Sequence, residues 1–262
     1  MSVRWVLGVR VDDVTYREAL DEIVRFVRDG GSHMITTPNP EIVMMAQGDP
    51  AYCSVLNRAA LAIPDGVGLL WAGRFAGLPF RDHVRGTDLI LQLASQSALH
   101  GHRWFLVGAA PGVADLAAAA LIRRVPALKI AGVHSGTSGP EGDNETRTAI
   151  SSVGGADVLL VAYGAPAQEL WLDRNLPVIG AAVGIGVGGV FNYLAGVAPR
   201  APAWLRALEL EWLHRLLTQP WRWRRQLALP RFVLRVLLAH FSPGALPPVI
   251  ESSPKSAEDK ST

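Results

Sequence analysis

Residues 104–124 read WFLVGAAPGVADLAAAALIRR, and this stretch contains the unit that decides the fold. Its first four residues are apolar and predict a buried strand, the turn GAAPG follows, and Val113–Arg124 is typical of a helix. The same order of strand, turn and helix recurs over residues 157–175, where the turn is YGAPAQE. Strands that alternate with helices in this way predict an α/β fold, a mostly parallel sheet with helices on both faces.

The alternation extends along the chain in both directions. We expect further strands over residues 3–11, 34–37, 61–63, 129–133 and 178–183. We expect further helices over residues 16–28, with Thr15 as the cap, and over residues 41–47, 51–60, 69–75 and 87–99. Ligands of such sheets bind beyond the carboxyl ends of the strands. The turns TPNP, PDG, GAAPG and YGAP fall at these ends, so the functional site is expected there.

Charge divides the chain into three parts. The 262 residues, 49% apolar and 18% charged, exclude wholesale disorder, and the single cysteine, Cys53, excludes an intramolecular disulfide. Residues 199–241 contain eight arginines and two glutamates, whereas residues 1–198 carry three more acidic than basic side chains. We therefore predict an α/β catalytic core over residues 1–198, a basic, tryptophan-rich helical appendage over residues 199–241 and a disordered tail over residues 242–262.

Four segments bear on the question of membrane contact. The N-terminal apolar run is too short for a signal peptide, and the uncharged residues 176–199 hold six glycines, so we interpret them as a strand and a glycine-rich turn rather than a membrane helix. The segment WRWRR (221–225) suits an anionic membrane surface, a phosphate-bearing site, a nucleic acid or a solvated basic face. The apolar, basic stretch RFVLRVLLAHF (231–241) beside it favours the membrane. The acidic core counts against nucleic acid, which we do not expect as a partner.

Four polar residues follow predicted strands or precede a predicted helix. Thr37 and Asn39 in TPNP offer a hydroxyl and an amide to a polar ligand, or they simply cap a helix. Asp65 in PDG is either a general base or a turn residue. Arg85, just before a helix, either binds a phosphate or carboxylate or is solvated. These residues are the candidates for chemistry at the strand ends.

Glycine-rich turns supply the other candidates. Gly108 in GAAPG, Gly164 in YGAP and Gly188 in VGIGVGG let a phosphate approach the backbone, or they only make tight connections. None of these turns has the spacing of a Walker A loop or of GxGxxG. The sequence has no HExxH, no clustered cysteine and histidine, no Asp-x-Asp and no GxSxG, so we expect neither a metal site nor a serine nucleophile.

Seven motifs resemble the WecG/TagA/CpsF glycosyltransferase family when they are taken together. They occur in order over roughly residues 10–235, and the last is the most specific: TPNPE, IPDGVG, RGTDL, VGAAPG, YGAPAQELW, GVGGVFNYLAG and RAPAWLRALELEWLHRLLTQPWRWRR. The resemblance implies a Rossmann-like core with a C-terminal helical appendage. It also implies inverting transfer of a sugar, typically N-acetylmannosamine from a UDP-sugar donor, to a polyprenyl-diphosphate-linked sugar. The reaction would serve cell-surface polysaccharide or teichoic-acid-type synthesis, at the cytoplasmic membrane face, without a metal or cofactor.

The resemblance also assigns roles to residues. Asp65 is the expected base, Thr37 is its neighbour, and the residues expected to bind substrate are Asn39, Arg85, Gly108, Gly164, Gln168, Gly188, Asn192, Arg215, Arg222 and Arg225. With no Asp-x-Asp to hold a metal, arginines and helix N-termini would meet the charge of the leaving UDP. Asn192 stands where the family leads us to expect Asp, which leaves the donor sugar open. The alternative is a catalytically inactive, membrane-associated sugar-nucleotide-binding protein, and an appendage that docks or undocks leaves a homo-oligomer open.

Overall fold

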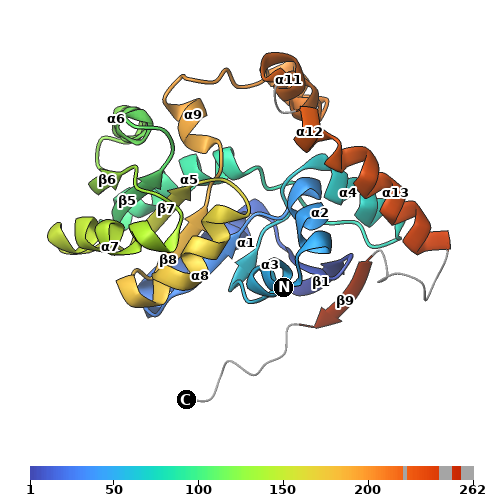
Figure 1. Ribbon diagram of the computed structural model, residues 1–262, viewed down its shortest axis with the longest axis horizontal. Helices are drawn as coiled ribbons and strands as arrows, with labels where there is room; N and C mark the ends of the chain where they lie inside the picture. Colours follow the sequence, from blue (N-terminus) through green and yellow to red (C-terminus); the bar gives the residue numbers. More distant parts are fainter. Residues whose placement is uncertain (221–222, 242–249, 255–262) are drawn as a thin grey trace.

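A six-stranded parallel sheet forms the centre of the molecule (Figure 1). The structure is a computed structural model that describes residues 1–220, 223–241 and 250–254. The strand order is β4-β3-β8-β7-β5-β6. The strands are β3 (His33–Thr36), β4 (Leu61–Ala62), β5 (Arg103–Gly108), β6 (Lys129–His134), β7 (Val158–Ala162) and β8 (Val183–Gly186). The α/β class is therefore confirmed.

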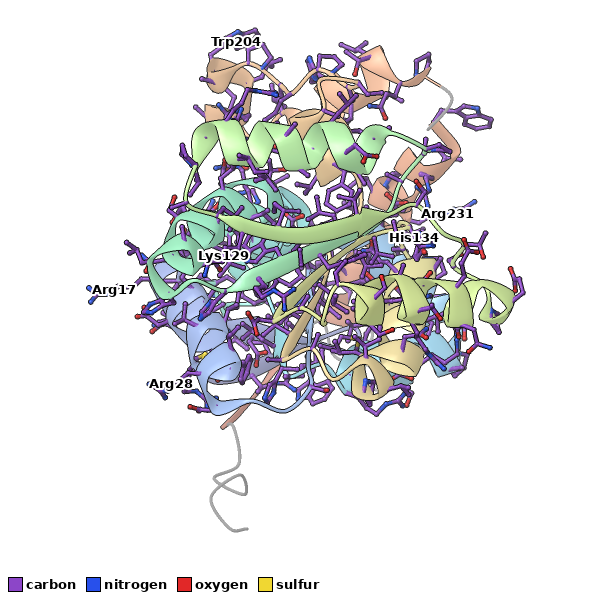
Figure 2. The ribbon with its side chains drawn as sticks, turned by 90° about the vertical axis from the view of Figure 1, so that its left-hand side faces the viewer. Arg17, Arg28, Lys129, His134, Trp204 and Arg231 are labelled. Atoms are coloured by element: carbon purple, nitrogen blue, oxygen red, sulfur yellow. The ribbon has the colours of Figure 1, made fainter. Side chains whose placement is uncertain are left out.

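Helices cover both faces of this sheet. One face carries α1 (Tyr16–Asp29), α5 (Gly86–His100), α6 (Val113–Arg124) and α9 (Val190–Leu194); the other carries α3 (Pro50–Asn57), α7 (Asp143–Ser152) and α8 (Ala167–Ile179), with the short helix η1 (Pro140–Gly142) before α7. Along β5, Trp104 and Leu106 pack on the first face, while Phe105 and Val107 pack on the second. In Figure 2 the edge strand β6 runs between its labelled ends, Lys129 and His134, with helices above and below it.

A second hydrophobic core lies beside the sheet. It joins the hairpin of β1 (Ser2–Val6) and β2 (Val9–Asp13) to α2 (Pro40–Gly48), α4 (Val67–Phe75) and α13 (Ala228–Phe241). Phe232, Val236 and Ala239 of α13 are buried in it. The helices α10 (Ala203–Ala207), α11 (Glu211–Thr218) and α12 (Trp223–Gln226) lead from the sheet to α13, along the upper right of Figure 1.

Three sequence expectations need correction. Residues 3–11 form two strands, because the chain turns at Leu7 and Gly8, both of which have positive φ. The strand expected over residues 178–183 is wrong: α8 continues to Ile179, Gly180 ends it in the left-handed conformation, and the glycine-rich VGIG is itself the buried strand β8. The helix α7 has no counterpart among the expected elements.

The C-terminal tail also differs from the expectation of disorder. Residues 250–254 form β9 (Ile250–Pro254), which pairs antiparallel with β1. The rest of the tail lies outside the described residues. No helix in the described part of the chain is long and apolar enough to cross a membrane.

Candidate active site

A cavity of about 370 Å³ opens at the carboxyl ends of β3, β4, β7 and β8. The chain leaves β3 toward α2 and α3, but it leaves the neighbouring β8 toward α9 on the opposite face. Adjacent strands whose connections diverge in this way create a crevice between them. Residues of the appendage, including Glu211 and Arg215, also line this pocket. The pocket therefore lies where the core meets the appendage.

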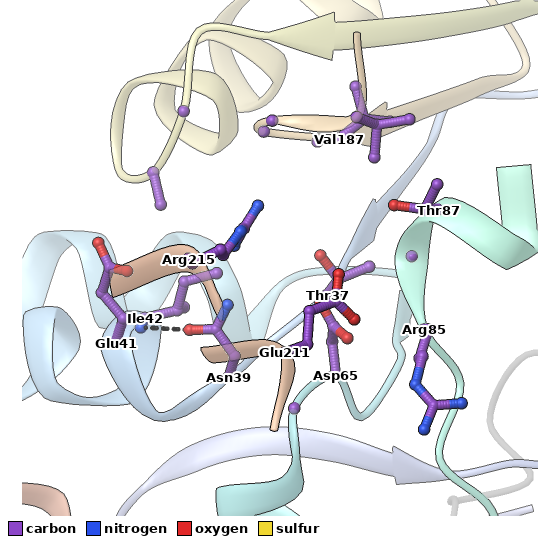
Figure 3. A pocket seen from close by; sticks show the side chains of 18 of the residues that line it. Thr37, Asn39, Glu41, Ile42, Asp65, Arg85, Thr87, Val187, Glu211 and Arg215 are labelled. Carbon is purple, nitrogen blue, oxygen red and sulfur yellow. Dashed lines mark hydrogen bonds between the residues drawn. The ribbon is translucent and has the colours of Figure 1, made fainter. Parts of the chain in front are cut away.

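Asp65 and its neighbours come from two adjacent turns. The Asp65 N–H donates to the Pro38 carbonyl at 3.0 Å, which ties the PDG turn after β4 to the TPNP turn after β3. Asn39 caps α2, because its side-chain oxygen accepts from the Ile42 N–H at 3.0 Å. Figure 3 shows the side chains of Asp65, Thr37 and Glu211 close together. The sequence interpretations of Asn39, as cap and as pocket residue, both describe it.

The Asp65 carboxylate lies in surroundings that disfavour its charged form. Protein surrounds it on most sides, although 31% of its side-chain surface is open to the cavity. Desolvation by burial raises the pKa of Asp65, and electrostatic interactions with His83 and Arg215 oppose that rise. Glu211, a like charge, adds to the rise. A carboxyl group whose pKa lies above its ordinary value is better matched to proton transfer near neutral pH.

Gln168 joins the two glycine turns rather than simply facing the cavity. Its Oε1 accepts from the Gly164 N–H at 3.1 Å and from the Gly188 N–H at 2.9 Å. Its Nε2 donates to Glu169 Oε1 at 2.7 Å. A Cβ on Gly186 would lie 2.7 Å from Gln168 Nε2, so only glycine fits beneath this amide. Gln168 thus sets the spacing of the turns that follow β7 and β8.

Arg85 contacts the appendage. Its Nη2 donates to Glu209 Oε1 at 2.6 Å and to the Arg206 carbonyl at 3.0 Å. The second carboxylate oxygen of Glu209 lies 2.9 Å from His83 Nδ1. His83 Nε2 in turn accepts from the Gly66 N–H at 3.1 Å, next to Asp65. Glu209 therefore connects the appendage to the turn that carries Asp65.

Arg215 brings a positive charge from α11 into the pocket. Its Nε donates to the Tyr193 hydroxyl, and its guanidinium carbon lies 5.2 Å from the centre of that ring. Gly189 makes room for it, since a Cβ there would lie 3.1 Å from Arg215 Nη2. In Figure 3 the guanidinium of Arg215 projects toward the middle of the pocket. It is thus placed to meet an anion beside Asp65.

Most of the remaining candidates also line the pocket. Arg225 lies 3.0 Å from Glu41 and donates to the Ala165 carbonyl at 3.1 Å, and Asn192 is another lining residue. Gly108 does not line it: its φ is positive and a Cβ there would lie 3.0 Å from the Tyr163 ring, which explains the glycine without a ligand. Arg222 lies outside the described residues.

Sequence reasoning missed several polar lining residues, among them His83, Tyr193, Glu209 and Glu211. The two glutamates are the only acids among the eight arginines of residues 199–241, and this isolation was a signal that they have specific partners. His83 shares a loop with Arg85, but nothing in its spacing shows that it faces Asp65. Tyr193 is adjacent to Asn192 in a motif of the resemblance.

The pocket contains groups able to bind an anion. The residues that immediately precede α2, α4 and α5, Asn39, Gly66 and Arg85, all line it, so three helix N-termini add partial positive charge to Arg215 and Arg225. Among the residues described, no three histidine, cysteine, aspartate or glutamate side chains form a group able to hold a metal ion. The arrangement can therefore take up a proton at the Asp65 carboxylate and bind an anion at the arginines.

Comparisons with known proteins agree with this chemistry. Residues 4–245 match the model of the glycosyl transferase WecG/TagA/CpsF family. The N-acetylglucosaminyldiphosphoundecaprenol N-acetyl-beta-D-mannosaminyltransferase of Bacillus spizizenii is 34% identical over 203 residues, which cover 78% of each chain. Proteins with the same name are 33% identical in Bacillus subtilis, over 78% of each chain, and 29% identical in Staphylococcus aureus, over 89% of this chain and 92% of that one.

Proposed function

The chain belongs to the WecG/TagA/CpsF family of glycosyltransferases, and we propose that it moves N-acetylmannosamine, or a related hexose, from a UDP-sugar to a polyprenyl-diphosphate-linked sugar. The names of its relatives describe transfer of N-acetylmannosamine to an N-acetylglucosaminyl-diphosphate lipid. The product belongs to the synthesis of a cell-envelope polysaccharide. The observation that supports this function best is the presence of Asp65 and the cation Arg215 in one pocket at the strand ends.

Asp65 is the proposed base. It takes the proton of the acceptor hydroxyl as that oxygen forms a bond to C1 of the donor sugar. The bond between C1 and the UDP oxygen breaks, and its electron pair leaves with the diphosphate. Thr37 lies beside Asp65 and offers a hydroxyl to the reacting sugars. A single displacement with one base inverts C1, which suits the β-linkage in the relatives' names if the donor sugar is α-linked to UDP.

Arginines take the place of a metal in this proposal. Arg215 and Arg225, with the N-termini of α2, α4 and α5, stabilise the charge that develops on the leaving diphosphate. The reaction should therefore need no divalent cation. Transfer in the presence of EDTA checks this: activity should stay within about twofold of the untreated enzyme, and loss of more than about tenfold that added Mg²⁺ restores would refute it.

The appendage supplies the proposed contact with the membrane. Its exposed apolar side chains include Trp204 (62% exposed), Trp223 and Phe241, and they occur among arginines. Figure 2 shows Trp204 projecting away from the body of the molecule and Arg231 on the outer surface. Tryptophan and arginine together suit the headgroup layer of an anionic bilayer, which would place the enzyme at the inner face of the cell membrane. Co-sedimentation with anionic vesicles, but not with zwitterionic ones, is expected.

Asp65→Asn tests the proposed function directly. Transfer to the lipid-linked acceptor should fall by about 10²- to 10⁴-fold, whereas the rise in melting temperature on adding UDP should remain, because the lost group acts on the acceptor proton. Glu145→Gln on the exposed surface of α7 is the control. Full transfer by Asp65→Asn would remove Asp65 as the base. UDP binding by the wild type without transfer to any lipid-linked sugar would instead favour the inactive sugar-nucleotide-binding protein.

A further inference from the structure

Glu169 is a buried carboxylate that the proposed mechanism does not use. It is 0% exposed and lies in the first turn of α8, directly after Gln168. Each of its oxygens accepts from one side chain: Gln168 Nε2 lies 2.7 Å from Oε1, and the Tyr52 hydroxyl lies 3.0 Å from Oε2. A buried carboxylate is costly unless its partners satisfy it. Glu169 therefore needs an explanation beyond packing.

The contacts of Glu169 decide which way the Gln168 amide points. An amide side chain has one oxygen and one NH₂ group, and the Gly164 and Gly188 N–H groups require the oxygen. An ionised carboxylate on the other side only accepts, so it requires the NH₂ group. Both demands agree on the observed orientation. The carboxylate thus reinforces the bonds that hold the two glycine turns.

We infer that ionised Glu169 is a positioning residue, which acts through Gln168 to hold the Gly164 and Gly188 turns at the spacing the pocket needs. The bond from Gln168 Nε2 to an ionised oxygen is charge-assisted and about twice as strong as the bond to a neutral acid. When Glu169 takes up a proton, that bond weakens and the Tyr52 hydroxyl has to change from donor to acceptor. The Gly164 and Gly188 N–H groups then lose part of their restraint.

The surroundings place this change near neutral pH. Desolvation by burial raises the pKa of Glu169 to about 7, against the opposing hydrogen bonds from Gln168, its own backbone and Tyr52. Gln168 faces it from α8 and Tyr52 faces it from α3. The other acids that act on Tyr52 are Glu41 and Asp49, and Glu41 is paired with Arg225.

Hydrogen exchange at the Gly164 and Gly188 amides tests the inference without any substrate. In the wild type, their protection, corrected for the intrinsic rate, should fall by about fivefold to tenfold between about pH 8 and about pH 5.5. Glu169→Gln should show the low protection at both pH values, because a neutral amide cannot provide the charge. The Phe105 amide in the centre of the sheet reports global opening and should not change.

Tyr52→Phe gives a second, conservative test with a defined direction. Loss of the donating hydroxyl removes support for the ionised form, so the fall in protection should move to higher pH by about one unit. Glu145→Gln removes an exposed carboxylate, 73% accessible, and should leave the profile unchanged. Protection at Gly164 and Gly188 that is independent of pH in the wild type, or a Tyr52→Phe profile that does not move, would overturn the inference.

A second readout rests on the proposed function. UDP should bind about fivefold more weakly to Glu169→Gln than to the wild type at about pH 8, and the two affinities should converge at about pH 5.5. Equal UDP affinity for both proteins at about pH 8 would overturn the link between the turns and the ligand. Failure of the wild type to bind UDP at any pH would refute the proposed donor instead, and the exchange measurements would still decide the role of Glu169.

Discussion

The glycine turns after β7 and β8 and the appendage helix α11 line the same pocket, but different forces hold them. The turns are fixed by the buried Gln168, which is 2% exposed and bonded to both of them. The helices α10 and α11 contain no buried residue, and ion pairs attach this part of the appendage to the core. These pairs join Arg85 to Glu209 at 2.6 Å and Arg200 to Asp88 at 2.7 Å. We call Gln168 with the Gly164 and Gly188 turns the core wall of the pocket, and α11 with Arg215 the appendage wall.

The two walls contribute different properties to the pocket: one contributes a fixed shape and the other a positive charge. The core wall contributes shape, because Gln168 holds both turns and leaves no room for a side chain at Gly186, where a Cβ would lie 2.7 Å from its Nε2. The appendage wall contributes Arg215, a cation that the core does not supply at this point. Ion pairs between partly exposed side chains contribute little to stability and weaken with salt. Changes to the appendage should therefore affect catalysis more than folding, and changes to the core wall should do the reverse.

Among the variants that test this comparison, Arg215→Ala should have the largest effect. Loss of a preorganised charge beside the leaving group should reduce transfer by about 10²- to 10³-fold, while the midpoint of urea unfolding changes little. Arg215→Lys keeps the charge but not the fork of donors, and should recover only part of the activity. A large drop in the unfolding midpoint of Arg215→Ala would show that α11 is part of the core.

The pH dependence of stability should reveal the buried carboxylate of the core wall. The pKa of Glu169 rises from 4.5 to about 7 on folding because burial disfavours its charge. The unfolded chain therefore loses this proton at lower pH than the folded protein does. The protonated carboxyl group stabilises the fold fully below pH 4.5, and this stabilisation is lost as the pH rises through about 7. The free energy of unfolding of the wild type should fall relative to that of Glu169→Gln by up to about 3 kcal/mol. Parallel stability curves for the two proteins would contradict this.

Gly186→Ala should destabilise the core wall without changing any charge. The new methyl group would meet Gln168 Nε2 at 2.7 Å, and Gln168 cannot move away without releasing Gly164 and Gly188. We expect a loss of about 1–3 kcal/mol in urea unfolding and weaker UDP binding. Gly180→Ala, where a Cβ meets no atom but φ is positive, separates backbone strain from the contact with Gln168.

Glu209→Gln should have the smallest effect on stability. It removes one carboxylate from Arg85 and His83, and ion pairs between partly exposed side chains contribute about 0–1 kcal/mol. Turnover should fall by about fivefold, and the difference from the wild type should shrink at high salt, where screening weakens the native pairs. An effect that does not depend on salt would mean that the docking of the appendage is not electrostatic.

The residues of the core wall could be predicted from the sequence better than those of the appendage wall. Thr37, Asp65, Gly164 and Gly188 follow strands of one parallel sheet, and parallel strands bring their carboxyl ends to one edge. The pattern of β8 misled because its glycines have low strand propensity, although close packing against α8 is what requires them there. The strand was therefore expected a few residues too early.

The contacts of the appendage were beyond sequence reasoning. Arg85 and Glu209 are 124 residues apart, and no local periodicity indicates that one neutralises the other. The resemblance named Arg215, Arg222 and Arg225 as phosphate ligands, but nothing in the sequence indicated that the nearby Arg200 and Arg206 lie beside Asp88 of the core. A count of charges shows where cations gather but not which of them are already paired.

The pairing of β9 with β1 joins the two ends of the chain, and this has a consequence for biosynthesis. About 240 residues separate the strands, so at about 5–20 residues per second a ribosome leaves the outer edge of β1 unpaired for tens of seconds. Asp65 emerges early in this interval, whereas Arg215 and α13 emerge shortly before β9. The nascent chain therefore contains Asp65 long before Arg215, and β9 completes the sheet that β1 and β2 began.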